Sequence, residues 1–323
     1  MCDIGQNEKD SQFSKNLSFS ENIELSLAIF KKVVDEISFF QPQVCIVATE
    51  PLLYSQIISA TEYVKEKGLK LSITTNGFLL NKYAEYLFKA GLDDLWISLD
   101  GNRGLNDFIR GIKGSFDRAI QGIRLINDLK ERMKSQKPKI YINFTISDLN
   151  CDHLVDFAKE MKNEKVNNIN FSHLNFVTEA MAKKHNETFG DFCKSTPSSI
   201  SKVNPQKVDI GILESQIKEI NTLFSRGGVS FTPDLKDKTS LYDYYCRHDI
   251  PVGKKRCLVP WTITSVQPNG DAILLTRCLN YVVGNVIKED FLEIWEGQGY
   301  QSFRKELWKN KYFPACTRCC GML

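Results

Sequence analysis

The sequence lacks several features that would place it in familiar classes of protein. No run of about 18 apolar residues occurs, so no segment is long enough to span a bilayer as a helix. The 42 basic and 39 acidic residues leave a net charge of +3, which gives no electrostatic case for binding nucleic acid or an anionic membrane. The first residues lack the basic and then apolar pattern of a secretory signal, so we expect a cytoplasmic protein.

Low-complexity tracts and internal repeats are also missing, and the length of 323 residues favours two domains or one α/β domain with an appendage. Cysteine, in contrast, is abundant, with ten residues. Half of them crowd the end of the chain, at Cys257, Cys278, Cys316, Cys319 and Cys320. In a cytosolic chain such clustering favours a metal site over disulfides.

Residues 22–176 alternate between helix-like and strand-like stretches. Apolar strands are predicted at 43–49, 69–75, 93–100, 139–147 and 166–177. Amphipathic helices are predicted at 21–38, 54–68, 81–91, 115–134 and 151–163. Strands and helices that alternate at this spacing form parallel βαβ units, and nearly continuous apolar strands indicate a sheet covered by helices.

The rest of the chain is less regular. Residues 177–210 are polar and are predicted to be a loop or linker, followed by an amphipathic helix within 211–228. Residues 257–323 are predicted to hold short strands and one helix at 289–310. We expect two domains, a barrel domain at 1–230 and a cysteine-bearing domain at 231–323.

Polar residues follow the predicted strands, where parallel α/β folds place their working side chains. Each of them alone is also typical of a turn, because Asn-Gly and Asp-Gly are common turn dipeptides. As an ordered set they predict a binding site at one edge of the sheet, built from Glu50, Asn76, Ser98, Asp100, Thr178 and Glu179.

The order and spacing of these motifs resemble the radical S-adenosylmethionine (SAM) enzymes over roughly residues 2–176. The Gly-Gly-Glu-Pro-like motif of that family is ATEP here, followed by TTNG and ISLDG after the next two strands. The resemblance implies an α/β fold, a partial (β/α)6 TIM-like barrel whose first strand is missing. It also implies SAM binding, with Glu50 at the amino group, Ser98 and Asp100 at the ribose, Arg110 at the carboxylate, and Thr75 and Asn76 nearby.

The same resemblance implies a role for Cys2. The family holds its radical-generating 4Fe–4S cluster on Cys-x3-Cys-x2-Cys after the first strand, and MCDIG resembles the end of that loop. We therefore expect Cys2 to be the third cluster cysteine and the first two to be encoded upstream of Met1. The alternative is that Cys2 is an isolated reactive thiol near the N-terminus.

The cysteines near the C-terminus form a second pattern. Cys257 and Cys278 flank a predicted hairpin with a PNGD turn, and Cys316 and Cys319 form Cys-x2-Cys. Four soft ligands suit either zinc or an iron–sulfur cluster. The PNGD, GN, LEIW and Cys-x2-Cys elements resemble the SPASM or shorter twitch extension of radical SAM enzymes, which implies an auxiliary 4Fe–4S cluster. Seven residues separate Gly270 from Cys278, more than in many members, so Cys320 is an alternative to Cys319.

By this resemblance, the intact enzyme cleaves SAM reductively and abstracts hydrogen from a substrate, with flavodoxin or ferredoxin as reductant. The substrate stays open between peptide, sugar and small molecule. Two alternatives remain: a remnant that binds one cluster without SAM chemistry, and a zinc-stabilised α/β binding protein. His173, Asn143 and Thr145 are expected to face the barrel interior, unless His173 is a hydrogen-bonded core residue.

Overall fold

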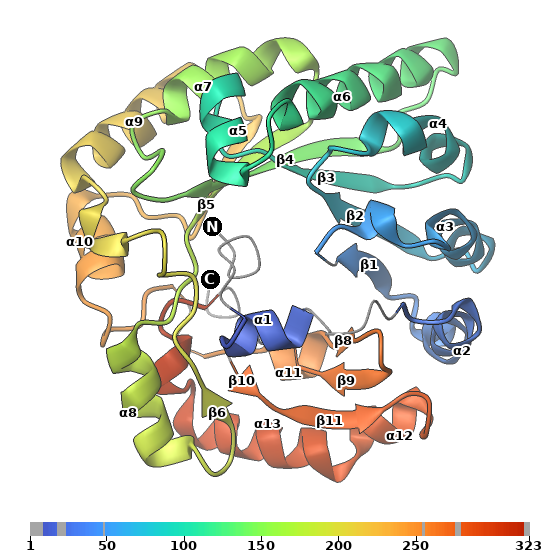
Figure 1. Cartoon of the computed structure of the whole chain (residues 1–323), viewed down its shortest axis with the longest axis vertical. Coiled ribbons are helices and arrows are strands. Elements are labelled where there is room, and N and C mark those ends of the chain that lie inside the picture. Colours follow the sequence, from blue (N-terminus) through green and yellow to red (C-terminus); the bar gives the residue numbers. More distant parts are fainter. Residues whose placement is uncertain (1–8, 18–23, 48, 254–255, 275–278, 320–323) are drawn as a thin grey trace. The chain divides into compact units, whose positions relative to one another are not determined.

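The computed structural model describes residues 9–17, 24–47, 49–253, 256–274 and 279–319 (Figure 1). The chain divides into two compact units. Unit 1 comprises Met1–Ile37, Leu174–Gln206 and Leu235–Leu323, and unit 2 comprises Ser38–His173 and Lys207–Asp234. Within the described residues, no helix is both long and apolar enough to cross a membrane. The domain boundary between residues 230 and 231 stays a prediction.

Unit 2 is a six-stranded sheet in the order β1-β2-β3-β4-β5-β7, with every neighbouring pair parallel (Figure 1). Its strands are β1 Gln43–Val47, β2 Lys70–Thr75, β3 Asp94–Ser98, β4 Lys139–Ile146, β5 Asn168–His173 and β7 Val229–Thr232. Its α-helices are α3 Ile57–Glu66, α4 Leu80–Lys89, α5 Arg103–Arg110, α6 Ser115–Arg132, α7 Leu154–Met161 and α9 Ile210–Leu223, and its short 3-10 helices are Ser38–Phe40, Pro51–Leu53 and Lys162–Glu164. The predicted parallel α/β architecture is confirmed.

The core of unit 2 lies between the sheet and these helices. Alternate residues of each strand point to the helices, so Phe144 on β4 and Phe171 on β5 pack against Phe157 on α7. Gly77, after β2, has a φ of +80°, and a Cβ there would lie 2.6 Å from the Ala119 Cβ of α6. The glycine of the TTNG motif is therefore required by close packing between this turn and a helix.

Unit 1 carries small sheets and most of the cysteine pattern. Its α-helices are α1 Gln12–Leu17, α2 Leu27–Ile37, α8 Glu179–Phe189, α10 Lys238–Cys246, α11 Val259–Thr262, α12 Phe291–Glu296 and α13 Gln298–Asn310. Its strands are β6 Lys194–Ser195, β8 Ser265–Val266, β9 Asp271–Ile273, β10 Leu279–Asn280 and β11 Val282–Asn285. A 3-10 turn at Pro314–Cys316 begins the Cys-x2-Cys segment. Strands β8 and β9 are antiparallel on either side of the PNGD turn, so the predicted hairpin is confirmed.

Two predictions of secondary structure were wrong, and one strand was not predicted. The predicted loop 177–210 contains α8, whose buried face is only Met181, Ala182 and His185, too short and too polar to give a clear apolar period. The predicted helix at 289–310 is two helices, because Gly297 between them is extended (φ −72°, ψ 170°). Strand β7 was not predicted, since its four residues have only partly buried or exposed side chains.

Candidate functional site

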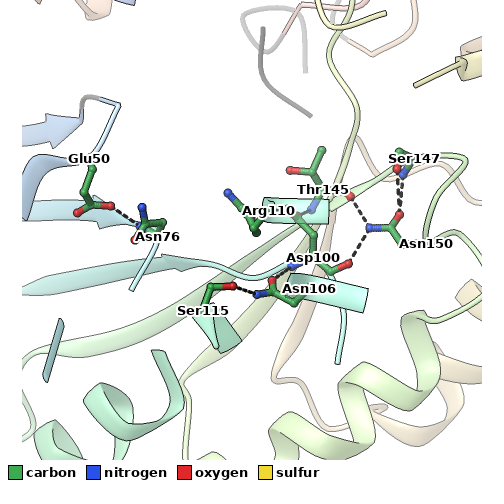
Figure 2. Close-up of polar contacts among 9 residues, drawn as sticks. All are labelled: Glu50, Asn76, Asp100, Asn106, Arg110, Ser115, Thr145, Ser147 and Asn150. Carbon is green, nitrogen blue, oxygen red and sulfur yellow. Dashed lines mark hydrogen bonds and ion pairs between the residues drawn. The ribbon is translucent and has the colours of Figure 1, made fainter. Parts of the chain in front are cut away.

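The first part of the site is built around the Glu50 carboxylate, which is 8% exposed. Its Oε1 accepts hydrogen bonds from the Thr75 hydroxyl at 2.6 Å and the Leu52 amide at 3.0 Å. Its Oε2 accepts one from the Asn76 amide at 2.8 Å (Figure 2). The structure thus brings Glu50, Thr75 and Asn76 together at the carboxyl ends of β1 and β2, as expected for parallel strands.

The second part is built around Asp100, which is 2% exposed and follows β3. One carboxylate oxygen accepts the Thr145 amide at 2.8 Å, and the other pairs with an Nη2 of Arg110 at 2.7 Å (Figure 2). The Asp100 amide donates to Asn106 at 2.9 Å, and its carbonyl accepts from Asn150 at 2.9 Å. Asp100 is therefore held in one orientation, with Arg110 fixed beside it.

Sequence reasoning missed Asn106 and Asn150, which hold the Asp100 backbone. Asn150 follows β4, so the rule of strand carboxyl ends points to it as it does to Asn76. Asn106 lies inside α5, is 1% exposed, and also donates to the Ser115 hydroxyl at 2.9 Å. A buried asparagine inside a helix needs long-range partners, and the local sequence does not identify them.

Arg110 has unused hydrogen-bonding capacity. Its Nε is buried and has no hydrogen-bond partner among the described residues, while its Nη2 binds Asp100. A buried, unpartnered guanidinium nitrogen is costly unless an anionic ligand accepts from it. Glu50 and Arg110 thus provide one acceptor and one donor on the same strand-end edge (Figure 2).

The face of the sheet away from the helices is polar and half-buried. Asn170 on β5 donates to Asn143 on β4 at 3.0 Å and accepts from the Thr232 hydroxyl at 2.8 Å. Asn143 is the register partner of Ser98 on β3. Ser98, Asn143 and Thr145 therefore share this face, and for Asn143 and Thr145 this is the predicted inner position.

His173 lies on the opposite face, so the structure contradicts the inward position and supports the alternative of a core residue. It shares the helix-covered face of β5 with Phe171 and is fully buried. Burial lowers the pKa of His173 to about 3, so it is a neutral core residue at physiological pH.

Only some of the predicted cluster cysteines lie within the described residues. Cys2, Cys278 and Cys320 lie outside the described residues. Cys257, Cys316 and Cys319 are half-buried in unit 1, and a hydrogen bond of 3.0 Å from the Cys319 amide to the Cys316 carbonyl closes the Cys-x2-Cys turn. The Cys257 amide donates to the Lys311 carbonyl at 3.3 Å. Among the described residues, no three His, Cys, Asp or Glu side chains form a group that could hold a metal ion, so the four-cysteine site stays a prediction.

Family comparisons agree with these two regions. Residues 6–135 match the Radical SAM superfamily, and residues 257–320 match SPASM, an iron–sulfur cluster-binding domain. Fe-coproporphyrin III synthase of Methanosarcina barkeri is 31% identical over 168 residues, covering 51% of this chain and 38% of that protein. Pre-heme d1 synthase of Dinoroseobacter shibae is 28% identical over 153 residues, covering 47% of this chain and 36% of that protein. The chain thus spans well under half the length of these relatives.

Solved structures agree on the fold. SuiB of Streptococcus suis bound to S-adenosylmethionine superposes with a TM-score of 0.62 at 17% identity, covering 91% of this chain and 64% of that one. Native anSMEcpe with bound AdoMet gives 0.62 at 14% identity, covering 96% and 84%.

The fold and the site at the strand ends are those of a parallel α/β protein that binds a cofactor at the carboxyl edge of its sheet. The chain carries a Radical SAM superfamily domain and a SPASM domain. Radical SAM domains bind SAM and a 4Fe–4S cluster, and SPASM domains bind auxiliary iron–sulfur clusters.

Proposed function

We propose that the complete protein containing this chain is a cytoplasmic radical SAM enzyme that abstracts hydrogen from its substrate and uses an auxiliary 4Fe–4S cluster. When bound and reduced by flavodoxin or ferredoxin, the SAM-ligated cluster supplies a 5′-deoxyadenosyl radical and methionine. The observation that carries the proposal is that the Glu50 carboxylate and the Arg110 guanidinium lie at the same edge of the sheet and that Nε of Arg110 has no partner among the described residues.

This pair fits the amino-acid end of SAM, which is a zwitterion. Oε2 of Glu50 accepts a single hydrogen bond within the described chain, so it keeps a lone pair for the SAM ammonium group. Arg110 would donate from Nε to the SAM carboxylate while Asp100 holds the guanidinium in place. Both oxygens of Asp100 already have donors, so its contacts favour positioning Arg110, and the Ser98 hydroxyl is the better placed partner for the ribose.

The donor set of the other site fits an iron–sulfur cluster by chemistry. Cys257, Cys316 and Cys319 are soft ligands, with Cys278 proposed as the fourth and Cys320 as the alternative to Cys319. Thiolate ligation requires reduced cysteines, which agrees with the predicted cytoplasmic location.

The experiment measures SAM binding and 5′-deoxyadenosine formation by the complete, anaerobically reconstituted protein with dithionite as reductant. Glu50→Gln removes the charge that receives the ammonium and should weaken SAM binding about 10- to 100-fold, because a hydrogen bond to a charged group contributes about 1.5–3 kcal/mol. Glu85→Gln, on the exposed face of α4, is the matched control and should bind SAM normally. Equal binding by both variants, or no 5′-deoxyadenosine from the wild type, contradicts the proposal.

The inner sheet face also favours a class of substrate. Beyond the first residue of each strand, β2, β3, β4, β5 and β7 carry hydroxyl, amide and aromatic groups there, and β1 carries Cys45 and Val47, but none of these side chains is charged. The residues on the five strands are Ser72, Thr74, Trp96, Ser98, Tyr141, Asn143, Thr145, Asn170, Ser172, Ser230 and Thr232. Porphyrin carboxylates and nucleotide phosphates call for cationic partners. A neutral substrate rich in amide or hydroxyl groups, such as a peptide or sugar, suits this face better.

Fe-coproporphyrin III and GTP test this choice, because two relatives are named Fe-coproporphyrin III synthase and GTP 3′,8-cyclase. Neither compound should raise the rate of 5′-deoxyadenosine formation above the rate without substrate. A clear acceleration by either one contradicts the preference for a neutral substrate and leaves the SAM chemistry intact.

A further inference from the structure

Arg318 lies between the two cysteines of the Cys-x2-Cys segment and is fully buried. Burying a guanidinium is costly unless its N–H groups all find acceptors. Here all five do. Nε donates to the Tyr244 carbonyl at 2.5 Å, and the two terminal nitrogens donate at 2.6–2.8 Å to the carbonyls of Asp243, Arg247, Ile250 and Thr317.

These acceptors identify what Arg318 holds. Four of the five carbonyls belong to residues 243–250, which form the last turn of α10 and the segment after it. The final carbonyls of a helix lack partners within the helix and carry partial negative charge. Thr317 adds a bond of 2.8 Å from its hydroxyl to the His248 carbonyl. The two middle residues of the cysteine turn are thus anchored on the end of α10.

We infer that Arg318 is the positioning residue that fixes Cys316 and Cys319 for the auxiliary cluster, and that Thr317 supports it. This rests on the proposed function, which supplies the cluster. Apart from this anchor, the bonds of 3.0 Å between Cys319 and Cys316 and of 2.8 Å between Cys316 and Phe313 shape the turn. The buried positive charge, on the residue next to Cys319, also favours the more negative, reduced state of the cluster.

The test compares iron release from the anaerobically reconstituted full chain to a chelator such as bathophenanthroline, together with the midpoint potential of the cluster. Arg318→Gln removes the charge and most of the donors and should speed iron release about 10- to 100-fold, as partners around metal ligands typically do. It should also make the midpoint potential more negative. Arg318→Lys keeps the charge with fewer donors, so its potential should stay nearer that of the wild type.

Two further variants keep the test decisive. Thr317→Val removes only the hydrogen bond to the His248 carbonyl and should speed iron release, but less than Arg318→Gln does. It provides a test of the anchor even if Arg318→Gln folds poorly. Arg304→Gln is the matched control. Arg304 in α13 also donates to main-chain carbonyls, but to those of Pro260 and Trp295, both at 2.9 Å, and not to the carbonyls that anchor the Cys-x2-Cys segment. Its iron release and potential should match the wild type.

The outcomes distinguish a failure of the role inferred for Arg318 from a failure of the auxiliary cluster assignment. Iron release and potential that are the same in wild type, Arg318→Gln and Thr317→Val overturn the inference and leave the cluster assignment standing. A wild-type chain that takes up zinc but no iron overturns the auxiliary cluster itself.

Discussion

Arg110 at the edge of the parallel sheet is half-buried and Arg318 in the cysteine turn is fully buried, and their N–H groups are used differently. Arg110 pairs with the Asp100 carboxylate at 2.7 Å and keeps a buried Nε with no partner among the described residues. Arg318 donates all five of its N–H groups to main-chain carbonyls. An arginine with an unused donor can bind an anionic ligand, whereas an arginine whose donors are all used holds its surroundings in place and acts on a neighbouring group only through its charge.

The regions around them differ in the same way. At the sheet edge, the groups that carry chemistry are carboxylates, and main-chain amides of the strand-end loops hold them directly. In the turn, the groups that carry chemistry are thiols, and the residues between them carry the anchor. The first design follows from the fold, and the second depends on contacts between residues about 70 positions apart.

The comparison predicts its largest effect, a loss of SAM affinity, for Arg110→Gln. Losing the guanidinium should weaken SAM binding about 10- to 100-fold, since hydrogen bonds to charged groups contribute about 1.5–3 kcal/mol. Thermal stability should fall as well, because the buried Asp100 carboxylate loses its cationic partner, so the SAM affinity is measured at a temperature where the variant and its control are both folded. Equilibrium dialysis with SAM measures the affinity, and Arg103→Gln, an exposed arginine paired with Asp117, is the control. Equal affinity in both variants would mean that the free donor of Arg110 serves no ligand.

The next largest effect concerns His173 in unit 2, which should make the stability of the protein depend on pH. Because burial lowers the pKa of His173 to about 3, the unfolded chain binds a proton below its ordinary pKa that the folded chain does not. Stability is therefore complete above that ordinary value and is lost as the pH falls, by about 2 kcal/mol at pH 5. Urea unfolding of wild type and His173→Gln at pH 7 and pH 5 measures it.

The variant should show a dependence on pH that is weaker by about that amount. His153→Gln, which changes a partly exposed histidine, should keep the wild-type dependence. If His173→Gln also keeps it, His173 is protonated in the folded protein and its core assignment is wrong.

The smallest effect concerns Asp93, a carboxylate with no ligand role at the opposite end of the sheet. Burial alone would raise the pKa of Asp93, but hydrogen bonds from Lys137, Lys65 and the Leu71 amide lower it below its ordinary value. Its stabilisation is thus present above the unfolded pKa and is lost as the pH falls through the lowered folded value. Asp93→Asn should cost about 1–2 kcal/mol at pH 7, because both lysines keep partial access to water.

Urea unfolding at pH 7 and near pH 3 checks this, with SAM affinity expected to stay unchanged. Asp117→Asn, whose carboxylate is more exposed, is the control and should cost less. A loss of SAM affinity in Asp93→Asn without a loss of stability would place the functional edge at the wrong end of the sheet.

The fold and the positions of the strand-end residues could be predicted because buried parallel strands are continuous apolar runs with short loops after them. That pattern located Glu50, Asn76 and Asp100. Their partners could not be predicted, because Thr145 and Asn150 meet Asp100 only once β3 and β4 pair in register. Helix α8 was missed because its buried face includes His185 and only two apolar residues.

The cysteine turn shows the same limit more strongly. Spacing alone identified Cys316 and Cys319 as ligand candidates, since thiolate ligands in a tight turn leave a recognisable pattern. Nothing in the local sequence identified Arg318, whose acceptors lie on another helix. Buried cations that bind carbonyls leave no periodic signal, so such anchors become visible only in the folded structure.

The most direct measurement is iron and acid-labile sulfide per chain, after anaerobic reconstitution, in the wild type and in Cys316→Ser. The account predicts about four irons and four sulfides attributable to the auxiliary cluster in the wild type and their loss in the variant. Cys45→Ser, a change at an exposed strand residue of unit 2, should keep them. Equal iron in wild type and Cys316→Ser, or zinc without iron in the wild type, would contradict the account.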